Sequence, residues 1–227
     1  METQTPETPR TSCIRCGSCC QAGGPVLHQE DLAVIRSGHA SHHHLTTIRK
    51  GEPARNPVLG QVLPAVDEIV RVSGQNKSWS CPFYEQGADV GICTIYEHRF
   101  LECRTLKCWD PDDILDIFGK DTVRREDLLN PRDPLLDVIA LHERECPFSQ
   151  VEPLVKTICE GGAGMAELTD LVNRDLAVRL YALSELGLDP GLEMFVFGRP
   201  VFKSLSTRGF QVFEDKGKVI LAWNPES

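Results

Sequence analysis

The sequence predicts an α+β protein that is mainly helical, with a cysteine-rich N-terminal half containing short strands and with a C-terminal β-hairpin. Three observations support this class. Eight of the ten cysteines fall between positions 13 and 108, where Gly and Pro often interrupt regular patterns. Asp-Pro pairs, which are typical of helix starts, recur beyond residue 109. Residues 209–223 alternate between apolar and polar around a turn-forming segment at 214–217, as a β-hairpin does.

The composition is that of a soluble globular protein, with 41% hydrophobic and 25% charged residues. Its 24 basic and 33 acidic side chains give a net charge of −9, which argues against nucleic acid as a partner. No apolar run approaches the roughly 18 residues of a membrane helix, and the polar start lacks a signal peptide's features. We therefore expect a cytoplasmic protein without a membrane partner, whose cysteines are metal ligands or catalytic thiols.

The N-terminal half is expected to hold few regular elements. Residues 1–12 are polar and predict a disordered tail. Residues 28–37 predict a short helix, with acidic residues in its first turn. The histidines at 39 and 42–44 are interpreted as a solvated loop. Residues 51–78 are interpreted as loop, with one strand at Ile69–Val72.

The second half of the chain is expected to be helical. Before it, residues 81–108 suggest a short hairpin that runs into a helix near 95–101. Asp110, Asp133 and Asp189 each precede a proline and predict N-caps. The longest periodic run, 165–186, predicts an amphipathic helix. We expect a metal-binding region at 13–108 and a helical region with a terminal hairpin at 109–227, joined in one compact unit.

The cysteine spacing is the strongest functional signal. Cys13, Cys16 and Cys19 follow one another with two intervening residues, which lets sulfurs converge on one centre from a tight turn. Cys20 is adjacent to Cys19 and would point the other way in an extended segment. This segment needs ligands from elsewhere in the chain. We call the full set of eight candidate ligands the cysteine array: Cys13, Cys16, Cys19, Cys20, Cys81, Cys93, Cys103 and Cys108.

The array resembles the CxxCxxCC cysteine-cluster family (YkgJ-like), whose members are described as zinc- or iron-chelating. The resemblance covers roughly 13–108, and Phe100 stands where the family usually has proline. A more distant similarity links the array to flagellin lysine N-methylases, in which a related cluster is thought to hold an iron–sulfur centre. The matching residues are Cys13-x-x-Cys16-Gly17-x-Cys19-Cys20, Cys81-Pro82-Phe83, Gly91-x-Cys93-x-Ile95-Tyr96-x-x-Arg99 and Cys103-Arg104.

The residues leave more than one metal open. Serial C-x-x-C-x-x-C is the opening of the bacterial ferredoxin pattern, although the C-x-x-x-C-P ending is absent. Zinc accepts four cysteines, so eight could hold two ions. We favour an iron–sulfur cluster, most simply 4Fe–4S, over zinc because no histidine is interleaved with the thiols. The remaining alternative is that the cysteines are incidental core residues.

Weaker signals surround the array. Tyr96, Arg99 and Arg104 could neutralise thiolate charge beside the cofactor, or could form an exposed helix face with an arginine salt bridge. Cys146 and Cys159 are expected to be buried in the core, although Cys146-Pro147-Phe148 repeats the Cys-Pro-Phe of position 81 and leaves Cys146 open as a ligand. The glycine-rich stretch 161–164 is interpreted as a turn between helices.

Two functions are compatible with these features. The first is a cytoplasmic metal-binding protein with a redox, metal-handling or scaffolding role and with a possible protein partner. The second is an iron–sulfur-dependent group-transfer enzyme, such as a protein methyltransferase. No catalytic residue is identified. A pocket lined by Tyr96, Arg99 or the 161–164 loop would favour the enzyme.

Overall fold

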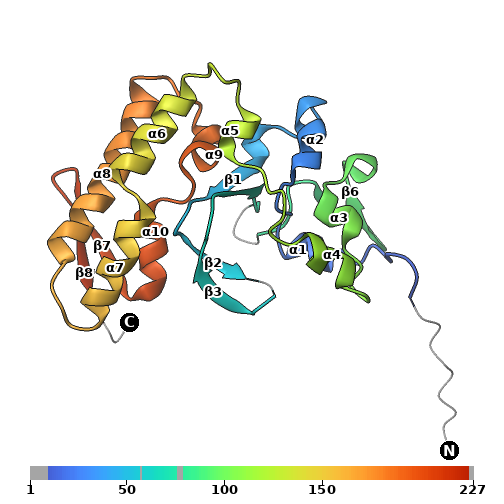
Figure 1. Ribbon diagram of the computed structural model, residues 1–227, viewed down its shortest axis with the longest axis horizontal. Helices are drawn as coiled ribbons and strands as arrows, with labels where there is room; N and C mark the ends of the chain where they lie inside the picture. The colour runs from blue at the N-terminus through green and yellow to red at the C-terminus, as the bar shows by residue number, and fades with distance from the viewer. Residues whose placement is uncertain (1–9, 57, 76–78, 225–227) are drawn as a thin grey trace, which may run out of the picture.

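The computed structural model describes residues 10–56, 58–75 and 79–224. Residues 1–9 of the tail predicted at 1–12 lie outside the described residues. Figure 1 shows the C-terminal helices and hairpin on one side of the molecule and the segments that carry the cysteine array on the other, with strand β1 (Leu45–Ile48) between them. No helix in the described part of the chain is both long enough and apolar enough to span a bilayer.

Short elements build the cysteine-rich half. They are α1 (Ser18–Gln21), η1 (Gln29–Asp31), α2 (Leu32–Arg36), η2 (His42–His44), β1, β2 (Pro53–Asn56), β3 (Gln61–Pro64), β4 (Ile69–Val72), β5 (Tyr84–Gln86), β6 (Gly91–Cys93), η4 (Tyr96–His98) and α3 (Leu101–Thr105).

Longer helices dominate the rest of the chain. The elements are α4 (Asp112–Ile117), α5 (Arg125–Leu128), α6 (Leu135–Glu145), α7 (Phe148–Cys159), α8 (Met165–Ser184), η5 (Pro190–Leu192), α9 (Glu193–Phe197), α10 (Val201–Leu205), η6 (Ser206–Arg208), β7 (Phe210–Asp215) and β8 (Lys218–Trp223). The mainly helical α+β class and the terminal hairpin are therefore confirmed.

The strands form four separate two-stranded antiparallel sheets, which pair β1 with β4, β2 with β3, β5 with β6, and β7 with β8. In the first sheet, Leu45 is opposite Val72 and Thr47 is opposite Val70, and all four side chains are buried. The backbone of Leu27 adds to this sheet, because its N–H donates to Val70 and its carbonyl accepts from Val123. This small sheet is the centre of the N-terminal half.

Several boundary predictions are confirmed and others are wrong. The strand at Ile69–Val72 and the turn at 161–164 are present, and the helix near 28–37 is divided into η1 and α2. Residues 51–78 are more regular than predicted, because β2 and β3 form a hairpin there. The helix predicted near 95–101 is replaced by η4 and α3, separated where Arg99 and Phe100 adopt extended backbone.

Two of the three predicted helix N-caps, Asp133 and Asp189, make the expected hydrogen bond, and Asp110 does not. The Asp189 carboxylate accepts the N–H of Gly191 at 2.8 Å, and the Asp133 carboxylate accepts the N–H of Leu135 at 3.0 Å. Asp110 does not cap α4, which begins at Asp112 after an N-cap position occupied by Pro111. Asp133 stands at the same offset before α6, so the two positions differ in the hydrogen bond that the side chain makes and not in their distance from the helix.

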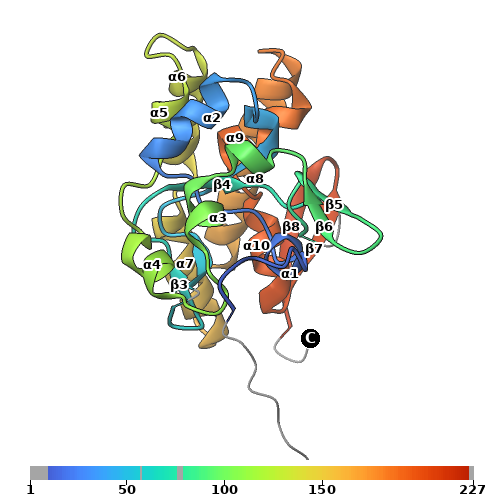
Figure 2. The same cartoon turned by 90° about the vertical axis from the view of Figure 1, so that its right-hand side faces the viewer.

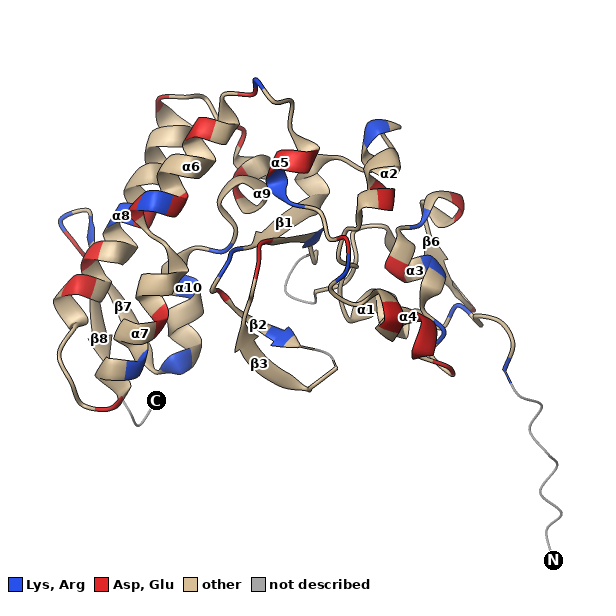
Figure 3. Ribbon diagram, in the orientation of Figure 1, with Lys and Arg blue, Asp and Glu red and all other residues tan. Residues whose placement is uncertain are grey.

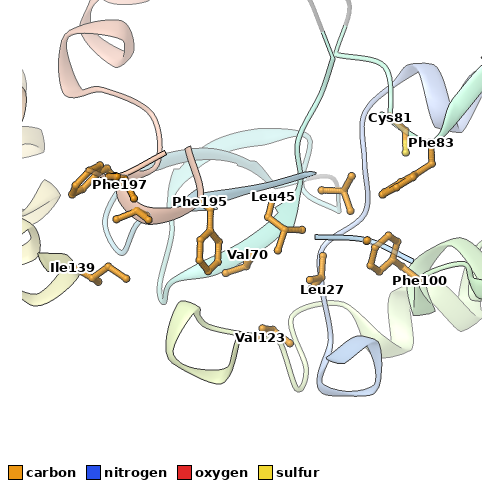
Figure 4. Close-up of a cluster of buried hydrophobic side chains, with 14 of the residues drawn as sticks. Leu27, Leu45, Val70, Cys81, Phe83, Phe100, Val123, Ile139, Phe195 and Phe197 are labelled. Atoms are coloured by element: carbon orange, nitrogen blue, oxygen red, sulfur yellow. The ribbon is translucent and has the colours of Figure 1, made fainter. Parts of the chain in front are cut away.

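The first hydrophobic core is shared between the two halves of the chain. Leu45 and Val70 from the central sheet lie against Phe195 and Phe197 of α9, while Phe83 and Phe100 extend the core towards the array (Figure 4). The Thr47 hydroxyl donates a 2.6 Å hydrogen bond to the carbonyl of Phe195. Burial of this apolar surface couples the two halves energetically.

A second core lies within the C-terminal half. Helices α7, α8 and α10 and the β7–β8 hairpin bury Phe148, Leu168, Leu171, Leu205 and Leu221 among one another. Leu168 and Leu171 of α8 therefore face a dry interior, as the periodic pattern predicts, whereas Leu180 further along the helix is exposed. Cys146 is buried beside this core, but Cys159 at the end of α7 is exposed, so the prediction that both are buried is wrong for Cys159.

Buried charges connect the two cores. Arg49 and Arg125 are almost completely buried, and both guanidinium groups donate to the Glu143 carboxylate, at distances of 2.7–2.8 Å. Figure 3 shows both acidic and basic residues along α6 and α8. Such pairs resist removal of one partner, because an isolated buried charge is costly.

Candidate metal centre

The first four cysteines lie on a tight turn that ends in α1. Arg15 and Gly17 both adopt the left-handed backbone conformation, with φ values of 55° and 79°. The Arg15 N–H donates to the Cys13 sulfur at 3.3 Å, the kind of amide–sulfur contact that accompanies thiolate-bound metal. Cys19 and Cys20 follow inside α1, with their sulfurs 4.0 Å apart.

Tyr84 fastens this turn to the β5–β6 hairpin. A Cβ atom at Gly17 would lie 2.3 Å from the Tyr84 hydroxyl, and one at Gly91 would lie 2.6 Å from its ring. The N–H of Gly91 also donates to the Arg15 carbonyl at 2.7 Å. The glycine between Cys16 and Cys19 is therefore needed for close approach as well as for its backbone conformation. Sequence reasoning missed Tyr84, although it follows the Cys-Pro-Phe motif directly.

An inner group of five cysteines forms around this junction. The Cys81 N–H donates to the Cys20 carbonyl at 2.8 Å, and Cys93 lies opposite Tyr84 in the hairpin. The Cys103 thiol, on α3, interacts electrostatically with those of Cys81, Cys93 and Cys19. Figure 2 shows α1, α3 and the β5–β6 hairpin on the same face of the molecule. The structure thus brings together two groups of cysteines that lie some 60 residues apart in the sequence.

Asp31 positions α3 and, with it, Cys103. Its carboxylate is fully buried and accepts the N–H groups of His28 at 2.9 Å and Leu101 at 2.7 Å. The neighbouring Glu102 carboxylate accepts the N–H of Val26 at 2.8 Å. Two carboxylates therefore satisfy backbone donors on the segments that meet at the array, and neither was identified from the sequence.

The thiols of the inner group have unequal acidity. The pKa of Cys19 falls to about 6, chiefly because the Cys20 thiol donates a hydrogen bond to it, and the pKa of Cys20 rises for the same reason. Loss of surrounding water raises the pKa of Cys81 and of Cys103, and repulsion from neighbouring thiolates adds to the effect. Cys103 retains exposed surface, so this desolvation is partial. A cation bound among these groups would offset the repulsion.

An outer group of three cysteines lies on the exposed side. The Arg10 guanidinium donates to the Cys108 sulfur at 3.2 Å and also attracts the Cys16 thiolate. The Cys16 sulfur lies 3.4 Å from the Ser18 hydroxyl, and this hydrogen bond lowers the pKa of Cys16. Cys13, Cys16 and Cys108 are all exposed.

The three predicted cofactor-side residues have different environments. The Tyr96 ring contacts two guanidinium groups, that of Arg99 at 3.7 Å and that of Arg15 at 4.3 Å from the ring centroid. These contacts tie η4 to the turn between Cys13 and Cys16. Arg104 forms an ion pair with Glu30 at 2.5 Å, which is the salt bridge that the sequence left as an alternative.

The histidines predicted as a solvated loop are exposed at positions 39 and 43, but residues 42–44 form the short helix η2. His42 contacts the Leu128 carbonyl at 3.1 Å, and the Nδ1 atom of His44 accepts the Ser41 N–H at 3.0 Å. The His43 ring pairs with Asp189 at 2.9 Å, and the His39 ring stacks on His98. Each ring therefore has its own partner, and the four do not converge on a common point.

The sulfur spacing distinguishes between kinds of metal site. Thiolates on one tetrahedral zinc lie ~3.5–4 Å apart, as bonds of ~2.3 Å require. Within residues 10–56, 58–75 and 79–224, no three members of the array have sulfurs that all lie within 4.8 Å of one another. The sulfurs of Cys19 and Cys20, which are 4.0 Å apart, reach the zinc spacing, but no third sulfur of the described array lies within 4.8 Å of both.

A separate group of three candidate ligands meets this distance limit. Its members are His142, Cys146 and Asp175, and all three are buried. This group lies outside the array, at the contact between α6 and α8. The sequence left Cys146 open as a ligand but gave no indication of Asp175, because only the fold brings α8 to this position.

A cavity of about 300 Å³ lies next to α3. Its lining includes His28, Leu101, Ile117 and Lys120. Tyr96, Arg99 and the 161–164 loop do not contribute to it. This cavity is therefore not the pocket, lined by Tyr96, Arg99 or the 161–164 loop, that would favour an enzyme.

Fold and site together define a thiolate-rich metal-binding protein. The chain matches the model of the CxxCxxCC family, described as "Putative zinc- or iron-chelating domain", over residues 12–127. The protein belongs to this family, and the match extends beyond the array as far as α5. No curated protein and no solved structure matches the chain. The similarity to flagellin lysine N-methylases has no support from these comparisons.

Proposed function

We propose that the cysteine array holds an iron–sulfur cluster, most simply 4Fe–4S, and that the chain serves in electron transfer or in the handling of iron. The observation that carries this proposal is the sulfur spacing. The thiols converge from three elements, and among the described residues no three array sulfurs lie within 4.8 Å of one another, a spacing that favours a cluster over one tetrahedral zinc ion. Ligands of a polynuclear cluster are more widely spaced, because each binds a different iron.

The inner group supplies the ligands in this proposal. Cys19, Cys20, Cys81, Cys93 and Cys103 offer five thiols for the four positions of a cluster. A bound cluster would provide a one-electron redox centre. Contacts of the Tyr96 ring with Arg15 and Arg99 hold the turn between Cys13 and Cys16 in place. The positive charge of the two guanidinium groups would offset the negative charge of the thiolates.

The outer group gives the site an exposed side. Cys13, Cys16 and Cys108 are exposed, and Arg10 donates to the Cys108 sulfur and attracts the Cys16 thiolate. Exposed thiols suit the exchange of metal or electrons with a protein partner. We propose that residues 13–108 are the metal-binding region of one compact cytoplasmic unit, and that the helical region 109–227 supports it.

Anaerobic purification tests the proposal. The protein should be brown, with broad absorbance near ~400 nm and with iron matched by acid-labile sulfide. Cys93→Ser should lose iron and sulfide together, whereas Cys159→Ser, which changes an exposed cysteine outside the array, should keep both. A colourless wild-type protein with stoichiometric zinc would refute the iron–sulfur proposal and leave metal binding intact.

A further inference from the structure

We propose that His142, Cys146 and Asp175 form a second, buried site for a zinc-like divalent cation, separate from the cysteine array. All three side chains are 0% exposed. One potential ligand atom from each lies within 4.8 Å of the other two. Nitrogen, sulfur and carboxylate oxygen together form a ligand set that zinc accepts, and three protein ligands are common in its sites.

Helix geometry brings these ligands together. His142 lies on α6, and Cys146 is the residue directly after the end of this helix. The two residues are four positions apart, so both side chains share one face of the helix. Asp175 lies in the middle of α8, which packs against α6. The His142 Nε2 atom is 2.6 Å from Asp175 Oδ1, and the Cys146 sulfur is 3.1 Å from the His142 carbonyl. The three groups thus belong to rigid, packed elements.

A surrounding layer of donors orients the carboxylate. Asp175 Oδ2 accepts the Val201 N–H at 3.0 Å, and Oδ1 accepts from the Arg179 guanidinium at 3.0 Å. Metal-bound carboxylates commonly have such outer partners. The arrangement therefore holds Asp175 in one orientation towards His142.

The polar atoms of the ring are not all satisfied. His142 Nδ1 is buried without a hydrogen-bond partner. A buried polar atom of this kind requires an explanation, because its desolvation is otherwise uncompensated. Coordination through Nδ1 would place the cation on the far side of the ring from Asp175, so a site with three ligands uses Nε2 instead. There the cation replaces the proton between Nε2 and Asp175 Oδ1, which lie 2.6 Å apart, and the neutral ring carries its proton on Nδ1.

The charges around the site leave room for a cation. The ion pairs that join the two cores contain four guanidinium groups and five carboxylates, with His142 neutral; the members are Arg49, Arg125, Arg179, Arg199, Glu52, Glu68, Glu143, Asp175 and Glu193. One negative charge is therefore unbalanced. A divalent cation that displaces the Cys146 thiol proton to solvent adds one net positive charge and completes the balance.

Burial gives this site a property that the array lacks. Several array cysteines are exposed, so a chelator reaches them, whereas a cation at His142 could leave only when the core opens. We expect protein from zinc-supplemented cells to keep one zinc per chain through native chelation and to release it in denaturant. The Cys93→Ser background, in which array metal is already lost, makes this result independent of the proposed cluster.

A matched pair of variants tests the assignment in that background. Cys146→Ser should lose the retained zinc, and Cys159→Ser should keep it. X-ray absorption on the chelated Cys93→Ser protein should show one sulfur among nitrogen and oxygen ligands, and this measurement decides the matter if Cys146→Ser does not fold. No retained zinc, retention by a folded Cys146→Ser, or all-sulfur coordination would overturn the proposal and leave a hydrogen-bonded core triad only.

Discussion

Replacing Gly17 with alanine would separate the two roles of this glycine. Gly17 has a φ of 79°, and Gly38 has the same φ at the end of α2. An added Cβ at Gly17 would lie 2.3 Å from the Tyr84 hydroxyl, whereas one at Gly38 would meet nothing within 4 Å. Gly38→Ala is therefore a control that carries the backbone cost without the steric contact.

The expected magnitudes follow from these contacts. A left-handed conformation costs an L-residue roughly 1–2 kcal/mol, so Gly38→Ala should lose about that much stability. In Gly17→Ala the Tyr84 ring must also move. It would forfeit hydroxyl hydrogen bonds to Gln86 at 2.6 Å and Gln21 at 3.1 Å, worth about 1 kcal/mol each. We expect Gly17→Ala to lose about 3–4 kcal/mol.

Urea unfolding of the metal-free variants measures these losses, and metal analysis of the anaerobically purified proteins measures the site. Gly17→Ala should bind less metal than the wild type because the turn no longer fits against the hairpin, whereas Gly38→Ala should bind a full complement. In a Tyr84→Ala background, Gly17→Ala should cost less stability than it does in the wild type. Equal destabilisation by Gly17→Ala and Gly38→Ala would show that the contact with Tyr84 has no energetic role.

Three further predictions concern the same region. Asp31→Ala should cost about 2–4 kcal/mol, because two buried N–H groups lose their acceptor, and hydrogen exchange at Leu101 should increase. In metal-free protein at pH 7, iodoacetamide should modify Cys19 much faster than Cys103. The rate at Cys19 should fall only below about pH 6, where its thiolate is protonated. Equal modification rates at Cys19 and Cys103 would contradict this prediction. Cys93→Ser should loosen β5–β6 and α3 in hydrogen exchange while α8 stays protected, and uniform protection would indicate a fold that does not depend on metal.

Local patterns explain what the sequence predicted correctly. The β7–β8 hairpin and α8 each carry their own periodic signal, and Ile69–Val72 alternates clearly enough to be recognised as a strand. Its partner Leu45–Ile48 was missed, because the sequence Leu-Thr-Thr-Ile does not alternate between apolar and polar residues and the pairing spans a long loop. The β2–β3 hairpin is largely exposed, so its sequence lacks the apolar alternation that a core imposes.

Long-range contacts account for what was missed at the site. The spacing of the cysteines indicated the array, but the roles of Tyr84 and Asp31 depend on segments about 70 residues away. Arg49 would ordinarily be assigned to the surface, since arginine is rarely buried without a partner. Its partner Glu143 lies 94 residues further along the chain. No local pattern indicates such a pairing.

The shared core has a consequence for synthesis of the chain on the ribosome. The β1–β4 sheet is covered by α9, and the bond from Thr47 to Phe195 spans 148 residues. At ~5–20 residues per second, that interval corresponds to roughly 7–30 s. During this time the second half of the array emerges while the apolar face of the sheet has no cover. Any metal acquired in that interval would bind a nascent chain. A chaperone that shields Leu45 and Val70 would determine how much of the nascent chain survives to fold.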